Sequence, residues 1–334
     1  MASYKEFHKR SIEDRNGFWG EQAELIHWNK QPEQIYDFSN PPFVKWFKGG
    51  ETNLCYNAVD RHAESNPNGK ALVYISTETD EEKTYSFSEL RTEVMRMAAI
   101  YQSLGVKKGD RVLIYMPMIA EACFAMLACA RIGAIHSVVF GGFASHSLAT
   151  RIDDAKPTVI VSADAGMRGG RPVPYKHLLD EAISLAEHKP AKVLMVNRGL
   201  DKEMVVVEGR DVDYATLRAA NMDANVPVTW LESSEPSYIL YTSGTTGKPK
   251  GVQRDTGGYA VALAASMKHI YCGNAGETFF STSDIGWVVG HSYIIYGPLI
   301  AGMATIMYEG TPLRPDAGIW WKICQEQEVT VMFS

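Results

Sequence analysis

The feature that most constrains the fold is an alternation, from Lys70 onward, of short β-branched runs with longer helical patterns. Strands that alternate with helices of about ten or more residues require crossover connections, which produce a largely parallel sheet. The sequence therefore predicts an α/β protein. The expected strands are 71–75, 111–115, 136–140, 158–162, 192–196, 238–241 and 305–308, with 204–207 as an added antiparallel piece; the expected helices include 88–104, 119–132, 148–154 and 175–188.

The first 60 or so residues differ from the rest because they are rich in aromatic side chains. So many rings need burial, so we expect helices and turns that lie against a larger body rather than an independent domain. A length of 334 residues agrees with roughly two domains at about 150 residues each. The rings are those of Phe18, Trp19, Trp28, Tyr36, Phe38, Phe43, Trp46 and Phe47.

Charge and hydropathy exclude several classes of partner. The chain has 33 Lys and Arg against 39 Asp and Glu, a net charge of −6, so it has no global attraction for nucleic acid or anionic lipid. The most apolar stretch, 112–144, is interrupted by Pro117, Glu121, Arg131 and His136, which suits a buried strand–helix–strand unit and not a membrane span. We expect small-molecule partners, no nucleic acid and no membrane; the oligomeric state stays open.

The cysteines and the N-terminus indicate a reducing compartment. The five cysteines form no CxxC pair and no zinc-like spacing, so we expect neither disulfides nor a metal site. The start of the chain, MASYKEFHKRSIEDR, contains acids and lacks the pattern of a signal or transit peptide. A cytoplasmic location is therefore expected.

The strongest local motif is YILYTSGTTGKPKGV at 238–252, a β run followed by glycines, hydroxyls and lysines. Glycines let backbone N–H groups converge on an anion, and lysines supply positive charge, so the motif suits a polyphosphate. A Walker P-loop is excluded, because only two residues separate Gly244 from Gly247 and Pro249 follows Lys248. A plain surface loop is disfavoured by the flanking strand. The candidate ligands are Thr242, Ser243, Gly244, Thr245, Thr246, Gly247, Lys248 and Lys250.

This motif resembles the phosphate-loop signature of the adenylate-forming superfamily, which includes acyl-CoA synthetases, luciferases and peptide-synthetase adenylation domains. Other segments resemble the short-chain acyl-CoA synthetases: VVFGGF at 138–143, RGGR at 168–171 and DIGWVVGHSYIIY at 284–296. The resemblance runs over the whole chain. It implies an N-terminal cap over 1–60 and the large AMP-binding domain over 61–334, with ATP, Mg2+ and coenzyme A as substrates.

The resemblance also implies roles for particular residues. Phe140, Gly141, Gly142 and the segment Arg168, Gly169, Gly170 and Arg171 correspond to coenzyme A contacts, although spacing alone fits a solvated basic turn equally well. Trp287, Val288 and Val289 correspond to the acyl-pocket wall, whereas composition alone favours core residues at these positions. The role of His291 stays open.

Three departures from the acetyl pattern favour the propionyl branch of the family. Val289 stands where acetyl enzymes carry Thr, RDTGGY at 254–259 replaces HTTGGY, and Leu313-Arg314 replaces Asn-Trp. The acetyl Asn contacts coenzyme A, so this departure puts that contact in doubt. The expected function is ATP-dependent activation of propionate to an acyl-adenylate, then to acyl-CoA; the alternatives are an acetyl-CoA synthetase or a non-catalytic nucleotide- or coenzyme A-binding fragment.

The end of the chain leads to one more expectation. EVTVMFS at 328–334 reads as a strand after a helix over 319–327, with no turn or closing element behind it. In the family, the adenine-binding motifs and the catalytic lysine follow later. We therefore expect a truncated AMP-binding domain that contains no catalytic residue and is inactive alone.

Overall fold

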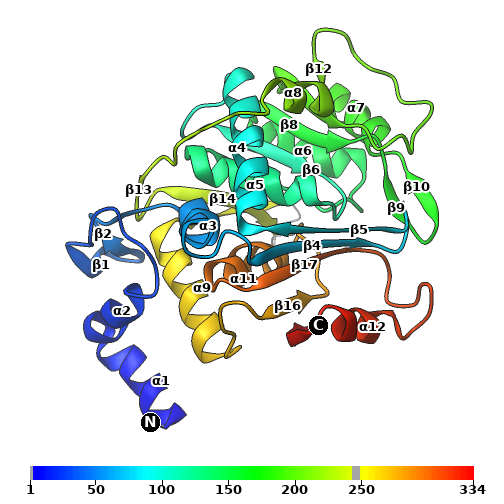
Figure 1. Cartoon of the computed structure of the whole chain (residues 1–334). Coiled ribbons are helices and arrows are strands. Elements are labelled where there is room, and N and C mark those ends of the chain that lie inside the picture. The colour runs from blue at the N-terminus through cyan, green and yellow to red at the C-terminus, as the bar shows by residue number, and fades with distance from the viewer. Residues whose placement is uncertain (1–2, 243–248) are drawn as a thin grey trace.

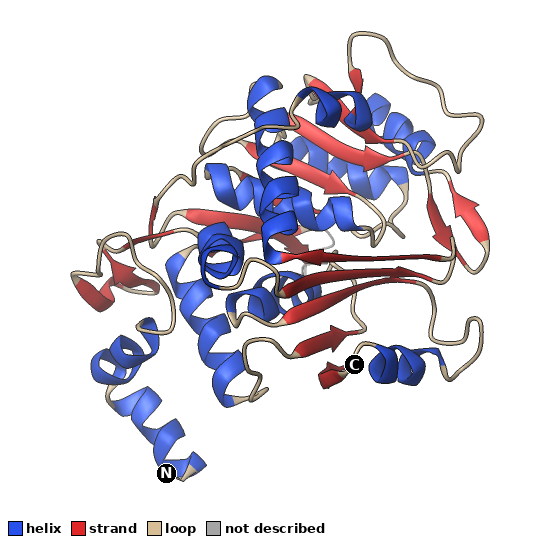
Figure 2. Cartoon of the chain, viewed as in Figure 1, coloured by secondary structure: helices blue, strands red, loops and turns tan. Residues whose placement is uncertain are grey.

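Two β-sheets with helices on their faces form the body of the protein, and the N-terminal segment lies at one side (Figure 1). The computed structural model describes residues 3–242 and 249–334. The helices separate and cover the sheets in Figure 2, so the α/β class expected from the alternating pattern is confirmed.

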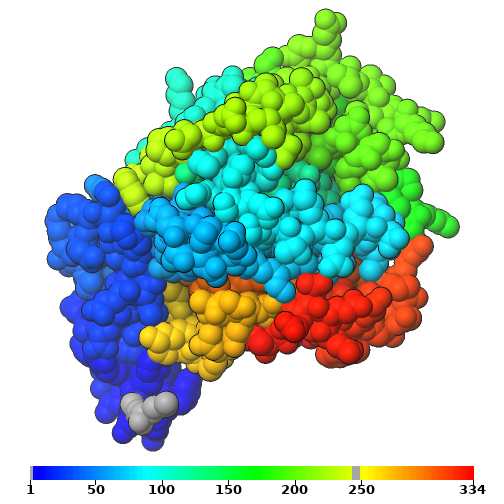
Figure 3. All heavy atoms as spheres, in the orientation of Figure 1, coloured from blue at the N-terminus to red at the C-terminus, as the bar shows by residue number. Residues whose placement is uncertain are grey.

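The N-terminal segment joins two helices to a hairpin. Helices α1 (Tyr4–Glu13) and α2 (Arg15–Ala23) precede the antiparallel pair β1 (Gln34–Asn40) and β2 (Phe43–Lys48). Ser3 and Glu6 form a capping box that fixes the start of α1. The Trp19 and Trp46 rings meet edge to face at 5.8 Å, which joins α2 to the hairpin. The segment packs against α9 (Gly257–His269), seen as blue against gold in Figure 3.

The larger sheet has seven strands in the order β12-β11-β8-β6-β7-β14-β15. All neighbouring pairs are parallel except β14 and β15, which form an antiparallel edge. The strands are β6 (Arg111–Tyr115), β7 (Ile135–Val138), β8 (Val159–Ala163), β11 (Lys192–Val196), β12 (Asp211–Asp213), β14 (Pro236–Thr242) and β15 (Lys250–Asp255).

Helices cover both faces of this sheet. Val112 and Ile114 of β6 belong to the core under α4 (Phe87–Ser103) and α5 (Ala120–Ile132). Leu113 and Tyr115 point the opposite way, into the core under α6 (Ser145–Ala155) and α7 (Tyr175–Leu185). Burial on both faces explains why these strands are continuously apolar in sequence. The short α8 (Tyr214–Ala220) packs against α4 and β11.

The smaller sheet has five strands in the order β18-β16-β17-β4-β5. It combines β4 (Lys70–Ser76) and β5 (Glu81–Ser86), an antiparallel pair, with β16 (Thr278–Ser281), β17 (Ala304–Glu309) and β18 (Val329–Phe333), which run parallel to β4. Helix α12 (Ile319–Glu326) covers one face through Ile319 and Ile323. The remaining elements are β3 (Glu51–Thr52), η1 (Tyr56–Asp60), α3 (Arg61–Ser65), β9 (Gly166–Arg168), β10 (Arg171–Val173), β13 (Leu231–Glu232), α10 (Val288–Gly290), η2 (His291–Tyr296) and α11 (Gly297–Ile300).

One expected strand is wrong. Residues 204–207 form a loop, and the edge position next to β11 is taken by β12, which runs parallel and not antiparallel. The valines of 204–207 are largely exposed. A β-branched composition does not form a strand when no neighbouring strand is available to pair with it. Among the residues that the structure describes, no helix combines the length and apolar character that a membrane crossing requires.

Candidate functional site

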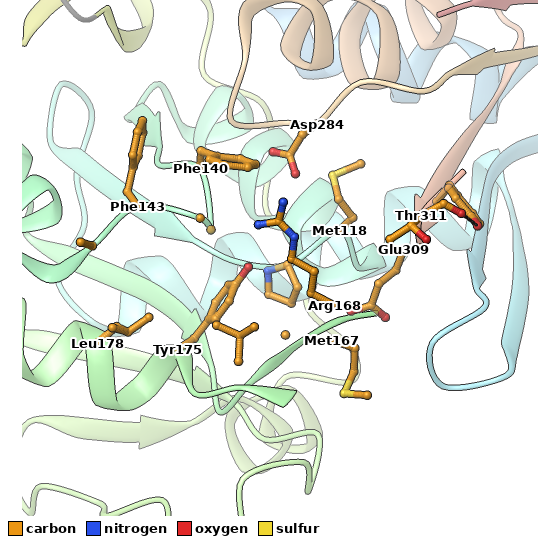
Figure 4. Close-up of a pocket in the computed structure, with 18 of the residues that line it drawn as sticks. Met118, Phe140, Phe143, Met167, Arg168, Tyr175, Leu178, Asp284, Glu309 and Thr311 are labelled. Atoms are coloured by element: carbon orange, nitrogen blue, oxygen red, sulfur yellow. Dashed lines mark hydrogen bonds between the residues drawn. The ribbon is translucent and has the colours of Figure 1, made fainter. Parts of the chain in front are cut away.

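A large cavity lies at the carboxyl ends of parallel strands from both sheets. Open α/β sheets bind ligands at this edge, because the loops that follow the strands converge there. The cavity has a volume of about 580 Å3 and is drawn in Figure 4. Its walls come from the segments that follow β6, β7, β16 and β17, together with β9 and the start of α7. The fold therefore places a site between the two sheets.

The strand that leads into the polyphosphate motif ends at the same edge. Strand β14 runs parallel to β7, and Thr242 at its end pairs with Lys250 of β15. Both side chains are exposed. The Tyr241 hydroxyl donates to Asp154 of α6 at 2.6 Å, which anchors the end of β14. The other six predicted ligands, Ser243, Gly244, Thr245, Thr246, Gly247 and Lys248, lie outside the described residues.

The predicted coenzyme A residues Phe140, Gly141 and Gly142 all line the main cavity. They belong to the loop after β7. A Cβ on Gly141 would come within 2.6 Å of Cζ of Tyr175, so only glycine allows this close approach. The Tyr115 hydroxyl donates to the carbonyl of Gly141 at 3.4 Å from the neighbouring strand. The loop is thus held between two buried tyrosines.

The two predicted arginines flank a tight turn between β9 and β10. Arg168 pairs with Arg171 across the hairpin, and Gly169 and Gly170 both have positive φ, +60° and +78°. Two-residue hairpins of this geometry favour glycine at both positions. Arg168 lines the cavity and reaches toward Asp284 in Figure 4, whereas Arg171 is exposed at the start of β10.

The predicted acyl-pocket residues lie beside the same cavity. Trp287 lines a second hollow of about 360 Å3, which shares Met118 and Asp284 with the first. The Trp287 ring is tilted against the Phe140 ring, with their centroids 5.6 Å apart. Val288 and Val289 follow at the start of α10, and Val288 is 43% exposed. The acyl and coenzyme A candidates are therefore neighbours in space.

His291, whose role the sequence left open, is packed against the predicted acyl-pocket segment. Its Nδ1–H donates to the Trp287 carbonyl at 3.0 Å, and its side chain is fully buried. Burial lowers the pKa of His291 to about 4, so the imidazole is neutral near pH 7. The hydrogen bond therefore joins a neutral imidazole to the backbone of Trp287.

Two acidic residues at the cavity were not singled out from the sequence. Burial raises the pKa of Asp284, which faces Arg168 and accepts the Gly286 N–H at 2.7 Å. Glu309 lines the cavity at the end of β17 and forms a buried bidentate pair with Arg198, with both contacts at 2.7 Å. Each acid comes at or just after the end of a strand in the smaller sheet, which is the signal that would have identified it.

Metal ligands do not gather in this part of the molecule. Within residues 3–242 and 249–334, no group of three or more His, Cys, Asp or Glu side chains is arranged to hold a metal ion. The cavity is lined mainly by glycines, aromatic rings and apolar side chains, and its charged lining residues are one arginine and two carboxylates.

Comparison with known proteins now decides the family. The profile described as AMP-binding enzyme matches residues 59–334, and that described as Acetyl-coenzyme A synthetase N-terminus matches residues 4–58. The chain belongs to the AMP-binding enzyme family. Within this family, a Propionate--CoA ligase of Salmonella typhimurium is 64% identical over 332 residues, 99% of this chain and 53% of that protein.

Further members of the AMP-binding enzyme family match over the same span. A Propionate--CoA ligase of Escherichia coli is 63% identical over 99% of this chain and 53% of its own length. The rat protein named Acyl-CoA synthetase short-chain family member 3, mitochondrial, is 48% identical over 100% of this chain and 49% of its own. The chain thus spans about half the length of the curated relatives that it matches.

Proposed function

We propose that this chain is part of an acid–thiol ligase. The enzyme activates a short-chain carboxylate, with propionate preferred, and transfers the acyl group to coenzyme A. The observation that carries the proposal is 64% identity to a Propionate--CoA ligase over 99% of the chain. The site supports it, because the candidate acyl residue Trp287 and the candidate coenzyme A residue Phe140 lie against each other where the two hollows adjoin. An acetyl-CoA synthetase is the alternative within the family.

The proposed reaction has two halves. The carboxylate attacks the α-phosphate of ATP, forming an acyl-adenylate and releasing pyrophosphate; the coenzyme A thiol then attacks the acyl carbon and releases AMP. Mg2+ enters as its complex with ATP and so belongs to the substrate. Such phosphoryl chemistry depends on positioning and charge neutralisation, and few protein groups take part covalently.

Each candidate set has a proposed place in this scheme. The motif 242–250 would hold the β- and γ-phosphates of ATP, the turn 168–171 a phosphate of coenzyme A, and Trp287, Val288 and Val289 the acyl chain. The segment 1–60 would act as the cap of the AMP-binding domain 61–334. These assignments rest on the motifs and on the convergence of their strands at one edge.

Carboxylate-dependent exchange between pyrophosphate and ATP tests the adenylation half in the protein as its gene encodes it. We expect exchange with propionate, and Lys248→Ala should slow it by about 10²–10³-fold, the loss typical when one transition-state donor is removed. Lys268→Ala, on an exposed lysine of α9, is the matched control and should leave the rate unchanged. Unchanged exchange in the Lys248 variant would remove the motif from the chemistry.

We further propose that residues 1–334 taken alone do not complete the reaction. The relatives are about twice as long as this chain. An incomplete ligase would not exclude water from the reactive adenylate. The isolated segment should form no propionyl-CoA from propionate, ATP, magnesium and coenzyme A. Turnover close to that of a complete short-chain synthetase would contradict this proposal.

A further inference from the structure

A third arginine lies on the turn that carries Arg168 and Arg171, although it is far away in sequence. A Cβ on Gly170 would lie 2.6 Å from Nη2 and 2.7 Å from Cζ of Arg314, and closer still to Nη1. The Arg314 guanidinium is therefore packed on the bare backbone of Gly170. Gly169, by contrast, has nothing within 4 Å of its Cβ position among the described residues.

The backbone of Arg314 is fixed in this position. Its N–H donates to the Thr311 carbonyl at 3.3 Å, which closes a turn over 311–314. The Tyr308 hydroxyl donates to the carbonyl of Thr311 at 3.2 Å, and the Arg314 carbonyl lies 3.5 Å from the same hydroxyl. Tyr308 and Thr311 both line the main cavity. Arg314 therefore sits at the rim, where the segment after β17 meets the β9–β10 hairpin.

The turn itself cannot offer its backbone donors to a ligand. The N–H groups of Gly169 and Gly170 donate to the two carboxylate oxygens of Glu78 at 2.9 and 2.6 Å. Glu78 belongs to the connection between β4 and β5, so it ties the hairpin to the smaller sheet. An anion that binds this turn must then be held by guanidinium groups, which grip phosphate through paired N–H donors.

The guanidinium groups of the three arginines remain able to bind an anion. Arg168, Arg171 and Arg314 are exposed, and none of them forms an ion pair with any residue that the structure describes. Guanidinium groups that form no ion pair with a described residue, on one turn at the rim of a ligand-sized cavity, suit a phosphate monoester that carries nearly two negative charges.

We propose that Arg314 is a further phosphate-binding residue, which acts with Arg168 and Arg171 on the phosphate monoester of coenzyme A. The proposal rests on the function proposed above and adds a residue to its coenzyme A site. It also assigns a reason for glycine at 170, since any side chain there would displace the Arg314 guanidinium.

Calorimetric titration of the protein as its gene encodes it, with coenzyme A and with 3′-dephospho-coenzyme A, tests the assignment. Arg314→Gln should weaken binding of coenzyme A about tenfold or more and leave the dephospho compound within about twofold, because only the former presents the monoester. Lys322→Gln, which removes an exposed cation from nearby α12, is the control for a general charge effect and should change neither affinity.

The two glycines allow an independent test by a double-mutant cycle. Gly169→Ala and Gly170→Ala both place alanine at positive φ, but only the second displaces Arg314. Gly170→Ala should therefore bind coenzyme A about fivefold or more weakly than Gly169→Ala, and the difference should vanish in the Arg314→Gln background.

The outcomes separate this inference from the proposed function. Equal losses for coenzyme A and its dephospho form in Arg314→Gln, or a glycine difference that survives without Arg314, would overturn the assignment while leaving the ligase proposal in place. A wild-type protein that binds neither compound would overturn both.

Discussion

At the residue scale, Val289 is the side chain through which acyl preference can be tested. Replacing it with Thr exchanges one methyl group for a hydroxyl at the start of α10, beside Trp287. One buried methylene is worth about 0.8 kcal/mol, so the preference for propionate over acetate should fall by about fourfold in kcat/KM. Val207→Thr, in an exposed loop, is the control and should leave the ratio unchanged. A ratio that stays constant or rises in the Val289 variant would exclude this side chain from the acyl pocket.

The candidate site residues show what sequence motifs can and cannot predict. Phe140, Gly141, Gly142 and Arg168 were predicted from motifs, and the structure brings them to one cavity. The partners of the turn were not predictable, because Glu78 is 91 residues from Gly169 and no local pattern links them. Such contacts depend on how the two sheets dock, which local sequence does not encode.

At the scale of elements, a buried ion pair joins the two sheets. Arg198 follows β11 of the larger sheet, and Glu309 ends β17 of the smaller one; their side chains are 10% and 4% exposed. The hydroxyls of Tyr74 and Ser76 also donate to Glu309, at 3.0 and 2.8 Å. The carboxylate is thus fully hydrogen-bonded between the sheets.

Glu309→Gln should therefore destabilise the protein strongly. Removing one partner of a buried pair leaves the other charge unpaired and typically costs about 3–5 kcal/mol. Urea unfolding would measure this loss, with Glu326→Gln as the control because the Lys322–Glu326 pair is exposed and worth at most about 0.5 kcal/mol. If the two variants lose equal stability, the pair does not hold the sheets together.

The elements themselves were predictable to different degrees. Strands buried on both faces, such as β6 and β11, appear in the sequence as continuous apolar runs, and their predicted bounds match the structure. The β1–β2 and β9–β10 hairpins were not expected; their strands are mostly exposed and belong to neither of the two large sheets. Residues 204–207 have the composition of a strand but no neighbour to pair with, so composition misled there.

At the scale of the whole molecule, the half-buried His62 and the fully buried His136 and His291 link stability to pH. Burial lowers the pKa of His62 to about 4, with help from the neighbouring Arg61, and lowers the pKa of His291 to about 4 as well. The pKa of His136 lies well below its usual value for the same reason. His62 lies in α3, His136 in β7 and His291 in η2. The effect of pH on stability therefore comes from several parts of the body of the protein and not from one site.

The sign of the effect follows from proton linkage. The unfolded chain binds protons on these imidazoles below about pH 6.5, whereas in the folded protein His62 and His291 do not bind them until near pH 4, and the pKa of His136 is also lowered by burial. The free energy of unfolding should therefore fall as the pH falls from 6.5, by up to about 1.4 kcal/mol per pH unit for each histidine. Urea midpoints between pH 7 and 5.5 would measure the slope. His62→Gln should reduce the slope, while His8→Gln, on an exposed residue of α1, should leave it unchanged. A stability that stays flat over this range would mean that the three imidazoles become protonated without unfolding, and hence that they are more accessible to water than their burial indicates.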